Sequence, residues 1–381
     1  MQLLSVATEG FRNLAAQQLV LSPRATVLAG PNGQGKTNLL EAIYLLSTLR
    51  PLRAQRLAEL VRFGGEGARV RGKFELPGGV REVEVVIEAG KRAAFVDGKP
   101  VRDPTDLFGG LAVVAFAPDE LAMVRGGPDG RRKLLDRAVQ NRHPDHLADA
   151  REYLRALKSR NALLKESAAA NLIDAFDAPL ARLGARIRLR RESVLAELRA
   201  HAGRAFAEVA RGEAPLQLRY QAAGRESNDL GESASHEAAQ KGARSLEERL
   251  RAALQGRLPR DRERGFTSVG PHADDLFFGI GDHAARLYAS QGQARATMLA
   301  FKIGEIEMLR AAQGRAPLLL LDDVSSELDP ERNSYLMEYL RALAGQVVLT
   351  TTDVRLVRAA AGQEALFHGV SAGLIAAEIN S

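Results

Sequence analysis

The sequence predicts an α/β protein: a head with a mixed sheet, an additional antiparallel β layer and an inserted all-helical lobe. Three observations support this fold class. A short apolar strand at 26–30 runs directly into a glycine-rich loop and an amphipathic helix, as in phosphate-binding α/β proteins. From about residue 130 to 256 apolar residues recur every three or four positions, as in helices. After residue 266 strand and helix patterns alternate again.

The first 120 residues contain short runs rich in β-branched residues, separated by turn signals. Asp97-Gly98 is a hairpin turn pair, because glycine and short polar residues accept the positive φ that a tight hairpin turn requires. We therefore expect a mostly antiparallel layer around one early helix, with strands at 26–30, 68–76, 81–90, 93–100 and 111–116.

The middle of the chain, residues 131–259, has the apolar spacing of long helices and predicts an all-helical lobe. Its segment 222–241 is rich in glycine, serine and glutamate, which indicates a surface loop. Strands separated by helices form one parallel sheet, so we expect 1–130 and 260–381 to build one domain. The expected apolar helix faces consist of Leu154, Leu157 and Leu164, and of Ile187, Val194, Leu198 and Phe206.

The composition limits the class of protein. The chain of 381 residues has no cysteine, which excludes disulfides and cysteine-ligated metals. No apolar run approaches the roughly 20 residues of a membrane span, so we expect a cytoplasmic protein without a membrane partner. The net charge of +6 favours polyanionic partners, although solubility alone explains such a charge equally well.

A phosphate loop follows the first strand, because Gly30, Gly35, Lys36 and Thr37 satisfy the pattern G-x-x-x-x-G-K-[ST]. Glycines let backbone N–H groups turn toward phosphate oxygens, and the start of the helix adds its positive end. Lys36 would reach the β and γ phosphates, and Thr37 would ligate Mg²⁺ through its hydroxyl. A glycine-rich turn without a ligand is the simpler alternative. We expect ATP and Mg²⁺, with ATP bound by Gly30, Pro31, Asn32, Gly33, Gln34, Gly35, Lys36, Thr37 and Asn38.

The run LLLLDD at 318–323 predicts a buried strand that presents two acids beside the phosphate loop. Asp322 would hold Mg²⁺ through water, and Asp323 would face the attacking water as a catalytic residue. Seen alone, the same run is also explained by a strand that ends in a polar turn. After the strand come SSELDP at 325–330, a helix at 331–343 and a strand at 346–352; before it, we expect a strand at 275–280 and a helix at 294–311.

The segment SQGQ at 290–293 opens a helix, with Ser290 at its cap and Gly292 allowing close backbone approach. By itself it is an ordinary helix cap. It precedes LLLLDD by one helix, and SSELDP follows that strand, which is the motif order of the ATP-binding cassette superfamily. In that superfamily the signature helix completes the nucleotide site of a second copy.

Several motifs together resemble the bacterial RecF family of DNA-repair ATPases, which are related to the heads of SMC proteins. They span nearly the whole chain in the right order: FRN at 11–13, GPNGQGKTNLLEAI at 30–43, GGPDGRRKLLD at 126–136, TSVGPHADDL at 267–276, SQGQ at 290–293 and LLDDVSSELD at 320–329. The resemblance implies an ABC-type, SMC-like ATPase domain and a homodimer that sandwiches ATP and binds DNA. It also implies RecO and RecR as partners in recombinase loading and SOS induction. The implied nucleotide contacts are Arg12, Ser290, Gly292, Gln293 and Asp329, with Lys36 and Ser290 also catalytic.

The sequence departs from the family pattern at several positions. Ala273 follows Gly-Pro-His where the family commonly has arginine, Asp119 takes the place of the Gln loop, and Thr352 that of a switch histidine. Asp323 is one methylene shorter than the catalytic glutamate of transporters. It should position water less well, which predicts slow hydrolysis and ATP acting mainly as a dimerising switch. His272, inside the GPH motif, has either a family role or a structural one.

Three basic groups are candidates for contact with DNA, although each alone is more often a solvated surface. Several on one side of a dimer would neutralise enough phosphates for salt-dependent binding. Aromatic residues make up 5% of the chain and tryptophan is absent, which favours contacts with the DNA backbone over stacking on bases. Backbone contacts favour duplex or junction DNA without excluding single strands. The groups are Arg50, Arg53, Arg56 and Arg62; Arg131, Arg132 and Lys133; and Arg182, Arg186, Arg188, Arg190 and Arg191.

Three alternative functions share part of this pattern. A transporter ATPase subunit needs a Gln loop and a switch histidine, which the sequence lacks. A small-molecule P-loop kinase has no use for SQGQ before LLLLDD. A nucleotide-gated scaffold with incidental hydrolysis overlaps with the DNA-binding interpretation. The chain also has no long heptad array, so tethering through extended coils is not expected.

Overall fold

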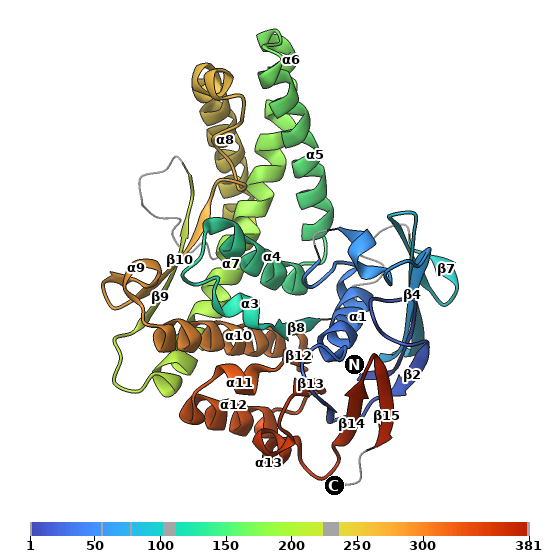
Figure 1. Cartoon of the computed structure of the whole chain (residues 1–381). Helices are drawn as coiled ribbons and strands as arrows, with labels where there is room; N and C mark the ends of the chain where they lie inside the picture. Colours follow the sequence, from blue (N-terminus) through green and yellow to red (C-terminus); the bar gives the residue numbers. More distant parts are fainter. Residues whose placement is uncertain (1, 55, 77, 102–111, 224–235, 379–381) are drawn as a thin grey trace. The chain divides into compact units, whose positions relative to one another are not determined.

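The computed structural model describes residues 2–54, 56–76, 78–101, 112–223 and 236–378. The chain divides into two compact units (Figure 1). The first consists of Met1–Ala122, His201–Glu213 and Ala289–Ser381, and the second of Met123–Ala200 and Ala214–Tyr288. The second unit therefore includes residues 260–288, which the boundaries drawn from the sequence placed with the nucleotide-binding domain.

An antiparallel sheet forms one layer of the first unit. The prediction of a hairpin at Asp97-Gly98 is confirmed, since both residues have positive φ, 50° and 75°, between two paired strands. On β4 every second side chain is buried, which produces one apolar face. The strand order is β2-β1-β4-β5-β6-β7, with β1 (Gln2–Glu9), β2 (Gln17–Val20), β4 (Gly67–Leu76), β5 (Gly79–Glu88), β6 (Lys91–Val96) and β7 (Lys99–Pro100).

A mixed sheet forms the second layer of this unit and is built from both ends of the chain, as predicted. Its central strands are buried throughout, in agreement with their continuous apolar sequences. All neighbouring pairs are parallel except β14 with β15. The order is β15-β14-β3-β13-β12-β8, with β3 (Ala25–Ala29), β8 (Val113–Phe116), β12 (Leu318–Asp322), β13 (Val347–Thr351), β14 (Leu366–Ser371) and β15 (Leu374–Glu378).

Helix α1 (Lys36–Thr48) contacts strands of both sheets and therefore lies between the two layers (Figure 1). Ala42, Ile43, Leu45 and Leu46 are completely buried there. Helix α10 (Gln291–Gln313) packs along β8 and α3. The other helices of this unit are η1 (Leu57–Leu60), α3 (Pro118–Leu121), α11 (Val324–Glu327), α12 (Pro330–Ala342), η2 (Val354–Leu356) and α13 (Arg358–Ala361).

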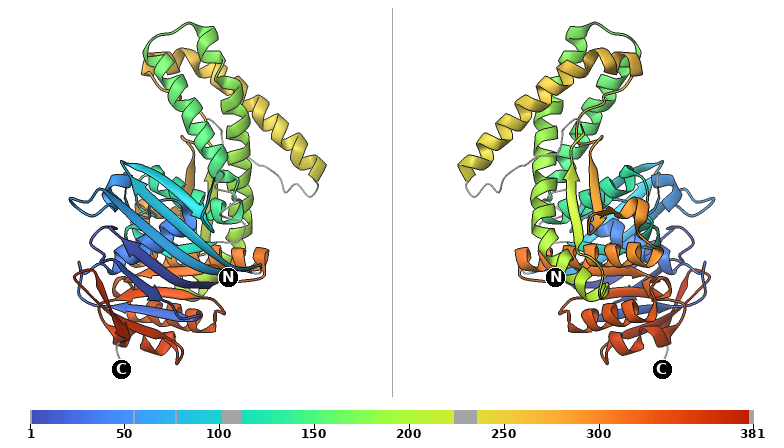
Figure 2. Two further views of the ribbon diagram at one scale, coloured as in Figure 1. Left: turned by 90° about the vertical axis from the view of Figure 1, so that its right-hand side faces the viewer. Right: turned by 90° about the vertical axis from the view of Figure 1, so that its left-hand side faces the viewer.

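The second unit is dominated by helices, three of which are long (Figure 2). Helix α7 begins in this unit, and its last turns belong to the first. Side chains of α5, α7 and α8, including Leu157, Leu183 and Leu250, share one apolar cluster. The helices are α4 (Pro128–Arg142), α5 (His146–Lys165), α6 (Ala170–Asp174), α7 (Asp177–Val209), α8 (His236–Arg264) and α9 (Ala285–Tyr288).

The expectation of an all-helical lobe is wrong. Residues Leu216–Gln221 alternate between apolar and polar and form strand β9, which pairs with β10 (Asp275–Ile280). Strand β11 (His283–Ala284) completes this small antiparallel sheet. Strand β10 therefore belongs to the second unit and not to the sheet around the phosphate loop.

Two further expectations for this region need correction. Of the loop predicted at 222–241, residues 224–235 lie outside the described part of the chain, and residues from His236 onward belong to α8. On α5 the side chain of Leu154 is exposed, and Tyr153 takes the inward position with Leu157 and Leu164. At the start of this face the buried residue is thus Tyr153 and not Leu154, because a large aromatic ring removes more apolar surface from water.

Across the described residues, no helix combines the length and apolar character that crossing a membrane requires.

Candidate nucleotide-binding site

The phosphate loop joins the buried strand β3 to α1. Gly35 precedes the helix with φ of 110°, a conformation that L side chains rarely adopt. At Gly30 a Cβ atom would lie 2.4 Å from the carbonyl oxygen of Val370, so only glycine allows β14 to approach this closely. The chain can therefore turn sharply from the strand into the helix, as a phosphate-binding loop requires.

The start of α1 is open to an anion. Gly35 provides no side-chain cap, and the first turn contains no acidic residue. The first backbone N–H groups of a helix have no partner within the helix and form the positive end of its dipole. This end of α1 therefore offers N–H donors and positive potential to a phosphate group.

Lys36 is buried, and its ammonium group lies over the loop. Nζ donates hydrogen bonds to the carbonyl oxygens of Gly30 at 2.6 Å and Pro31 at 2.9 Å, and contacts Asn32 Oδ1 at 3.5 Å. Burial lowers the pKa of Lys36, whereas the charges of Asp323 and then Asp322 act to raise it. The Lys36 ammonium group thus lies within the electrostatic influence of Asp322 and Asp323 at the end of β12. Its hydrogen-bond partners are backbone oxygens, which the oxygens of a bound phosphate could replace.

Asp322, Thr37 and Thr350 form a compact oxygen cluster. Thr37 Oγ1 donates to Asp322 Oδ1 at 2.7 Å, and Thr350 Oγ1 lies 3.0 Å from the same atom. A hydroxyl and a carboxylate oxygen suit Mg²⁺, which keeps several waters and takes its remaining ligands from substrate phosphates. Within the described residues no group of three or more His, Cys, Asp or Glu side chains could hold a metal. The two candidate ligands, Thr37 and Asp322, would therefore hold Mg²⁺ only together with a bound nucleotide.

Asp323 begins the turn that follows β12. Its backbone has φ of 47°, in the left-handed region, and its N–H donates to Thr350 Oγ1 at 2.9 Å. Its Oδ1 is buried and has no hydrogen-bond partner within the described part of the chain. An unpaired buried carboxylate oxygen is costly, so this geometry suits a group that acts on a bound ligand or water.

A second set of ion pairs surrounds this cluster and was not predicted. Arg12 Nε donates to Glu41 Oε2 at 2.6 Å, and the backbone N–H of Arg53 donates to the other oxygen of the buried Glu41 at 3.0 Å. The guanidinium of Arg53 lies 3.4 Å from Asp119 and 3.7 Å from Asp322. Arg53, which the sequence grouped with other arginines as a candidate DNA contact, thus lies beside the predicted Mg²⁺ ligand Asp322. Sequence alone could not show this, because Arg53 follows the C-terminal end of α1 and only the folded chain brings it close to Asp322.

The turn between β14 and β15 supports the phosphate loop from behind. Ala372 N–H donates to Gln34 Oε1 at 2.7 Å, and Gly373 N–H donates to the backbone oxygen of Gln34 at 2.9 Å. A Cβ atom at Gly373 would lie 1.9 Å from the carbonyl oxygen of Asn13, so no other residue fits this turn. Gln34 is thus a support of the loop as well as one of its predicted ligand contacts.

The signature segment Ser290–Gln293 has the geometry of a capping box. Ser290 Oγ accepts a hydrogen bond from the N–H of Gln293 at 3.1 Å, and Gln293 Oε1 accepts one from the N–H of Ser290 at 2.8 Å. Gln293 Nε2 also donates to Glu213 at 2.8 Å. The side chain of Gln293 is therefore occupied, and a nucleotide contact by Gln293 would need these bonds to break.

Gly292 and Asp329 both lie close to the guanidinium group of Arg332. A Cβ atom at Gly292 would be 3.3 Å from Arg332 Nη1. Asp329 accepts from the N–H of Arg332 at 3.0 Å, caps α12 and pairs with the Arg332 guanidinium, which lowers the pKa of Asp329. The start of α10 and the start of α12 are therefore neighbours.

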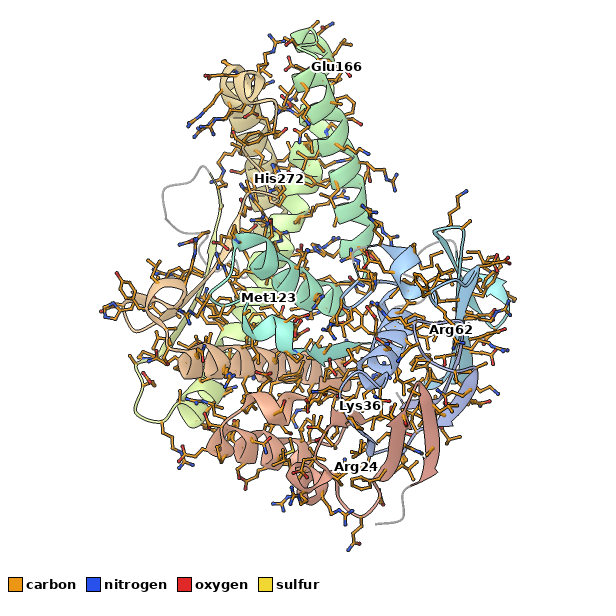
Figure 3. The ribbon with its side chains drawn as sticks, viewed as in Figure 1. Arg24, Lys36, Arg62, Met123, Glu166 and His272 are labelled. Atoms are coloured by element: carbon orange, nitrogen blue, oxygen red, sulfur yellow. The ribbon has the colours of Figure 1, made fainter. Side chains whose placement is uncertain are left out.

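The signature segment does not lie beside the phosphate loop of the same chain. Figure 1 labels α10, and Figure 3, in the same view, labels Lys36 beyond the C-terminal end of that helix, away from its first turn. A helix of 23 residues is about 35 Å long. Lys36, Thr37, Asp322 and Asp323 therefore come together within one chain, whereas Ser290 and Gly292 remain apart from them.

The arginines of α4 and α7 form ion pairs within the second unit. Arg131 pairs with Asp275, Arg188 with Asp274 and Arg191 with Asp136, and these three arginines are buried. Arg132 donates to the Asp274 carbonyl oxygen and pairs with Asp129, and Arg182, Arg186 and Arg190 face Glu152 or Asp149. Arg131, Arg188 and Arg191 are therefore occupied inside the protein, whereas Arg182 and Arg186 stay about half exposed, and helical spacing alone could not reveal these differences.

His272 is part of the same buried polar core. Its Nε2 donates to the carbonyl oxygen of Thr267 at 2.9 Å, and its Nδ1 accepts from the hydroxyl of Tyr153 at 2.7 Å. Burial lowers the pKa of His272, so the ring is neutral at pH 7. The neighbouring Ala273 donates its N–H to the carbonyl oxygen of Gly270 at 2.9 Å, and together these bonds give the GPH motif a structural role.

Comparison with known proteins gives one consistent result. A sequence model of the family described as RecF/RecN/SMC N terminal domain matches residues 2–371. The chain is 55% identical over 379 residues to a DNA replication and repair protein RecF of Anaeromyxobacter dehalogenans, covering 98% of this chain and 99% of the relative. It is 53% identical over 378 residues to the RecF of Myxococcus xanthus, covering 99% and 97%.

Solved structures agree with these relatives. A structure of the recombination mediator protein RecF with ATP, of the RecFOR pathway, matches with a TM-score of 0.85 and 30% identity and covers 99% of this chain and 97% of that chain. An Smc head bound to a domain of ScpA matches with a TM-score of 0.56 and 16% identity over 98% and 96% of the two chains. The predicted fold class, an ABC-type, SMC-like ATPase head, is confirmed.

Proposed function

Because the chain belongs to the RecF family of DNA replication and repair proteins, we propose that it is an ATP-switched DNA-binding protein of recombinational repair. The observation that carries this proposal is the complete nucleotide cluster. The loop cation Lys36, the hydroxyl of Thr37 and the carboxylates of Asp322 and Asp323 meet at the open start of α1. Related RecF has been solved with ATP, which supports ATP as the ligand.

The residues present fit ATP with Mg²⁺. The open N–H groups of α1 and Lys36 would hold the β and γ phosphates, and Thr37 and Asp322 would hold Mg²⁺. When bound, the metal would neutralise the charge of the phosphate oxygens. Asp323 would orient a water molecule for attack on the γ phosphate. Its short side chain supports slow hydrolysis, so that ATP acts mainly as a switch.

A second copy of the chain would complete the site. Ser290 and Gly292 belong to the start of α10, which lies away from Lys36 of the same chain, and a facing copy could bring them to the γ phosphate (Figures 1 and 3). Only ATP has this phosphate, so ATP but not ADP would favour the dimer. Two copies would then enclose two ATP molecules.

DNA would contact arginines for which the described residues provide no ion pair. On α8, Arg257, Arg260 and Arg264 recur at i, i+3 and i+7 and share one flank of the helix. Arg260 and Arg264 are exposed and Arg257 is half-buried, and no ion pair of any of the three is found within the described ranges. Lys165 lies against Gly265 at the end of this helix and adds a further positive charge. These residues replace the α4 and α7 clusters as the proposed phosphate contacts.

The direct test is sedimentation of the protein with a labelled gapped duplex at physiological salt, with ATP, with ADP and without nucleotide. We expect dimers that bind DNA only with ATP. Ser290→Arg should abolish the dimer and retain ATP binding, whereas Ser159→Arg, a control at an exposed position of α5, should behave as the wild type. ATP-dependent dimers of Ser290→Arg, or a monomer in all conditions, would contradict the proposal.

The DNA surface is tested by replacing Arg257, Arg260 and Arg264 with glutamine. Each lost phosphate contact reduces the slope of log K against log salt by about 0.9. For the triple variant the magnitude of this slope should therefore be smaller by about 2 to 3, and DNA of every sequence should bind more weakly. As a control with the same charge change, Arg69, Arg71 and Lys73 on β4 are replaced with glutamine; an equal loss in both would show only an effect of net charge.

RecO and RecR are proposed as partners, because related structures belong to the RecFOR pathway. Pull-down of each purified partner with the ATP-bound protein, and with Ser290→Arg, would test this. Capture of either partner by the wild type would support it.

A further inference from the structure

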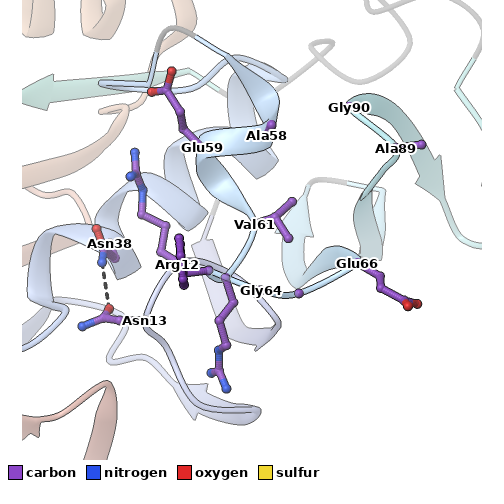
Figure 4. A pocket seen from close by; sticks show the side chains of 13 residues that line it. Arg12, Asn13, Asn38, Ala58, Glu59, Val61, Gly64, Glu66, Ala89 and Gly90 are labelled. Carbon is purple, nitrogen blue, oxygen red and sulfur yellow. Dashed lines mark hydrogen bonds between the residues drawn. The ribbon is translucent and has the colours of Figure 1, made fainter.

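A pocket of about 1000 Å³ opens beside the phosphate loop (Figure 4). Two asparagines connect it to the loop. Asn38, in the first turn of α1, donates through Nδ2 to Asn13 Oδ1 at 2.7 Å, and Asn13 Nδ2 lies 3.5 Å from the carbonyl oxygen of Gly33. A molecule whose phosphates occupy the loop could therefore extend directly into this pocket. The remaining wall comes from Arg12, from residues 58–66 and from the turn at Ala89 and Gly90.

The segment after η1 holds an aromatic side chain at the edge of this pocket. Val61 forms a β-bridge with Phe11, and the N–H of Arg62 donates to the carbonyl oxygen of Gly10 at 2.7 Å. A tight turn follows, in which the N–H of Gly65 donates to the carbonyl oxygen of Arg62 at 2.8 Å. Phe63 occupies the second position of this turn, which is thus fixed to residues 10 and 11 after β1, two residues before Asn13.

Phe63 has no burial in the protein, since its exposed fraction is 104%. Gly64 follows with φ of 76°, and no atom beyond its chain neighbours lies within 4 Å of a Cβ placed there, so the tip of the turn is open. A single exposed phenylalanine is common on protein surfaces. This one differs because it lines a pocket that Asn13 and Asn38 connect to the phosphate loop, and a planar aromatic ring is a good stacking partner for a nucleic-acid base.

We propose that Phe63 is the contact for the base of the bound nucleotide, with its ring stacked on the purine while the phosphates lie over Lys36. This inference rests on the proposed ATP binding and adds a residue that the phosphate-loop pattern does not contain. Every base has an aromatic face, so stacking provides affinity without selecting adenine over guanine. Phe63 should therefore strengthen binding of ATP and GTP to a similar degree and have no effect on a ligand without a base.

The experiment measures binding of ATP, GTP and inorganic tripolyphosphate, each with Mg²⁺, by calorimetry. Phe63→Ala should weaken ATP and GTP about tenfold, as expected for the loss of one stacking contact. Tripolyphosphate affinity should stay within about twofold of the wild type. Phe63→Trp should restore nucleotide affinity. Phe266→Ala, at another exposed phenylalanine in the second unit, is the matched control and should change nothing.

The possible failures are distinguishable. If the wild type binds neither ATP nor tripolyphosphate, the proposed function fails. If the wild type binds ATP and Phe63→Ala binds it equally well, the role of Phe63 is wrong. An equal loss of ATP and tripolyphosphate in Phe63→Ala also overturns it, because the turn would then support the loop and not the base.

Discussion

The replacement Asp323→Asn tests the catalytic centre with little disturbance of the fold. Asparagine has the shape of aspartate and accepts the left-handed backbone at this position, where φ is 47°. Asp323 Oδ1 has no hydrogen-bond partner in the described part of the chain, so the change removes charge without breaking a known side-chain bond. The free energy of unfolding should therefore change by less than about 1 kcal/mol.

The effect on hydrolysis should be much larger. A positioned base contributes about 10² to 10⁴ in rate, so we expect a fall of at least about 100-fold, or about 2.7 kcal/mol in activation free energy. Because the wild-type reaction is expected to be slow, single-turnover hydrolysis of radiolabelled ATP over hours is the suitable assay. ATP-dependent dimers should persist longer in this variant, and Asp282→Asn, at an exposed turn, serves as the control.

Two results would refute this reasoning. A hydrolysis rate within threefold of the wild type would show that Asp323 does not act on the water. Loss of ATP binding in calorimetry would show that its charge serves to hold Lys36 and not to assist the chemical step.

Three further predictions concern groups that hold the structure together. Gly270→Ala should lower the free energy of unfolding by about 2 kcal/mol or more in urea titration, because its Cβ would lie 2.3 Å from the Tyr153 hydroxyl; an unchanged midpoint would contradict this packing. His272 has a lowered pKa in the fold, so the unfolded chain binds its proton more readily. Stability contributed by its neutral form should be complete above the unfolded pKa of about 6.5 and decrease as the pH falls below it; His272→Gln should lose less stability than the wild type between pH 7.5 and 5.5. Gly373→Ala should weaken ATP binding, because its Cβ would lie 1.9 Å from the carbonyl oxygen of Asn13 beside the phosphate loop; calorimetry showing wild-type affinity would contradict this support.

Local sequence patterns predicted the arrangement of the loop and the acidic strand end because these parts are local. A phosphate loop consists of consecutive residues between a strand and a helix, and LLLLDD presents its acids at the end of the same buried strand. The structure brings Lys36, Thr37 and Asp322 together as the pattern indicates. The sheet that joins both ends of the chain also followed from alternating strands and helices.

The partners of charged residues could not be predicted in this way. Arg188 and Arg191 have the spacing of a basic helix face, yet each pairs with an acid more than 50 residues away in the sequence. Charge pattern along one helix contains no information about which acids the fold places opposite it. Arg53 was assigned to DNA for the same reason, although it reaches Asp322 through the tertiary structure. Strand β9 was missed because its six residues interrupt a long helical pattern.

The central position of β3 has a consequence for synthesis of the chain. Its hydrogen-bonding neighbours in the mixed sheet are β13 and β14, which begin at residues 347 and 366, and the turn that supports Gln34 lies at residues 372 and 373. When the phosphate loop leaves the ribosome, both strands that enclose β3 are still untranslated. Nucleotide affinity should therefore arise only near the end of translation. Prematurely terminated products would retain the whole phosphate-loop sequence and still be unable to sequester ATP.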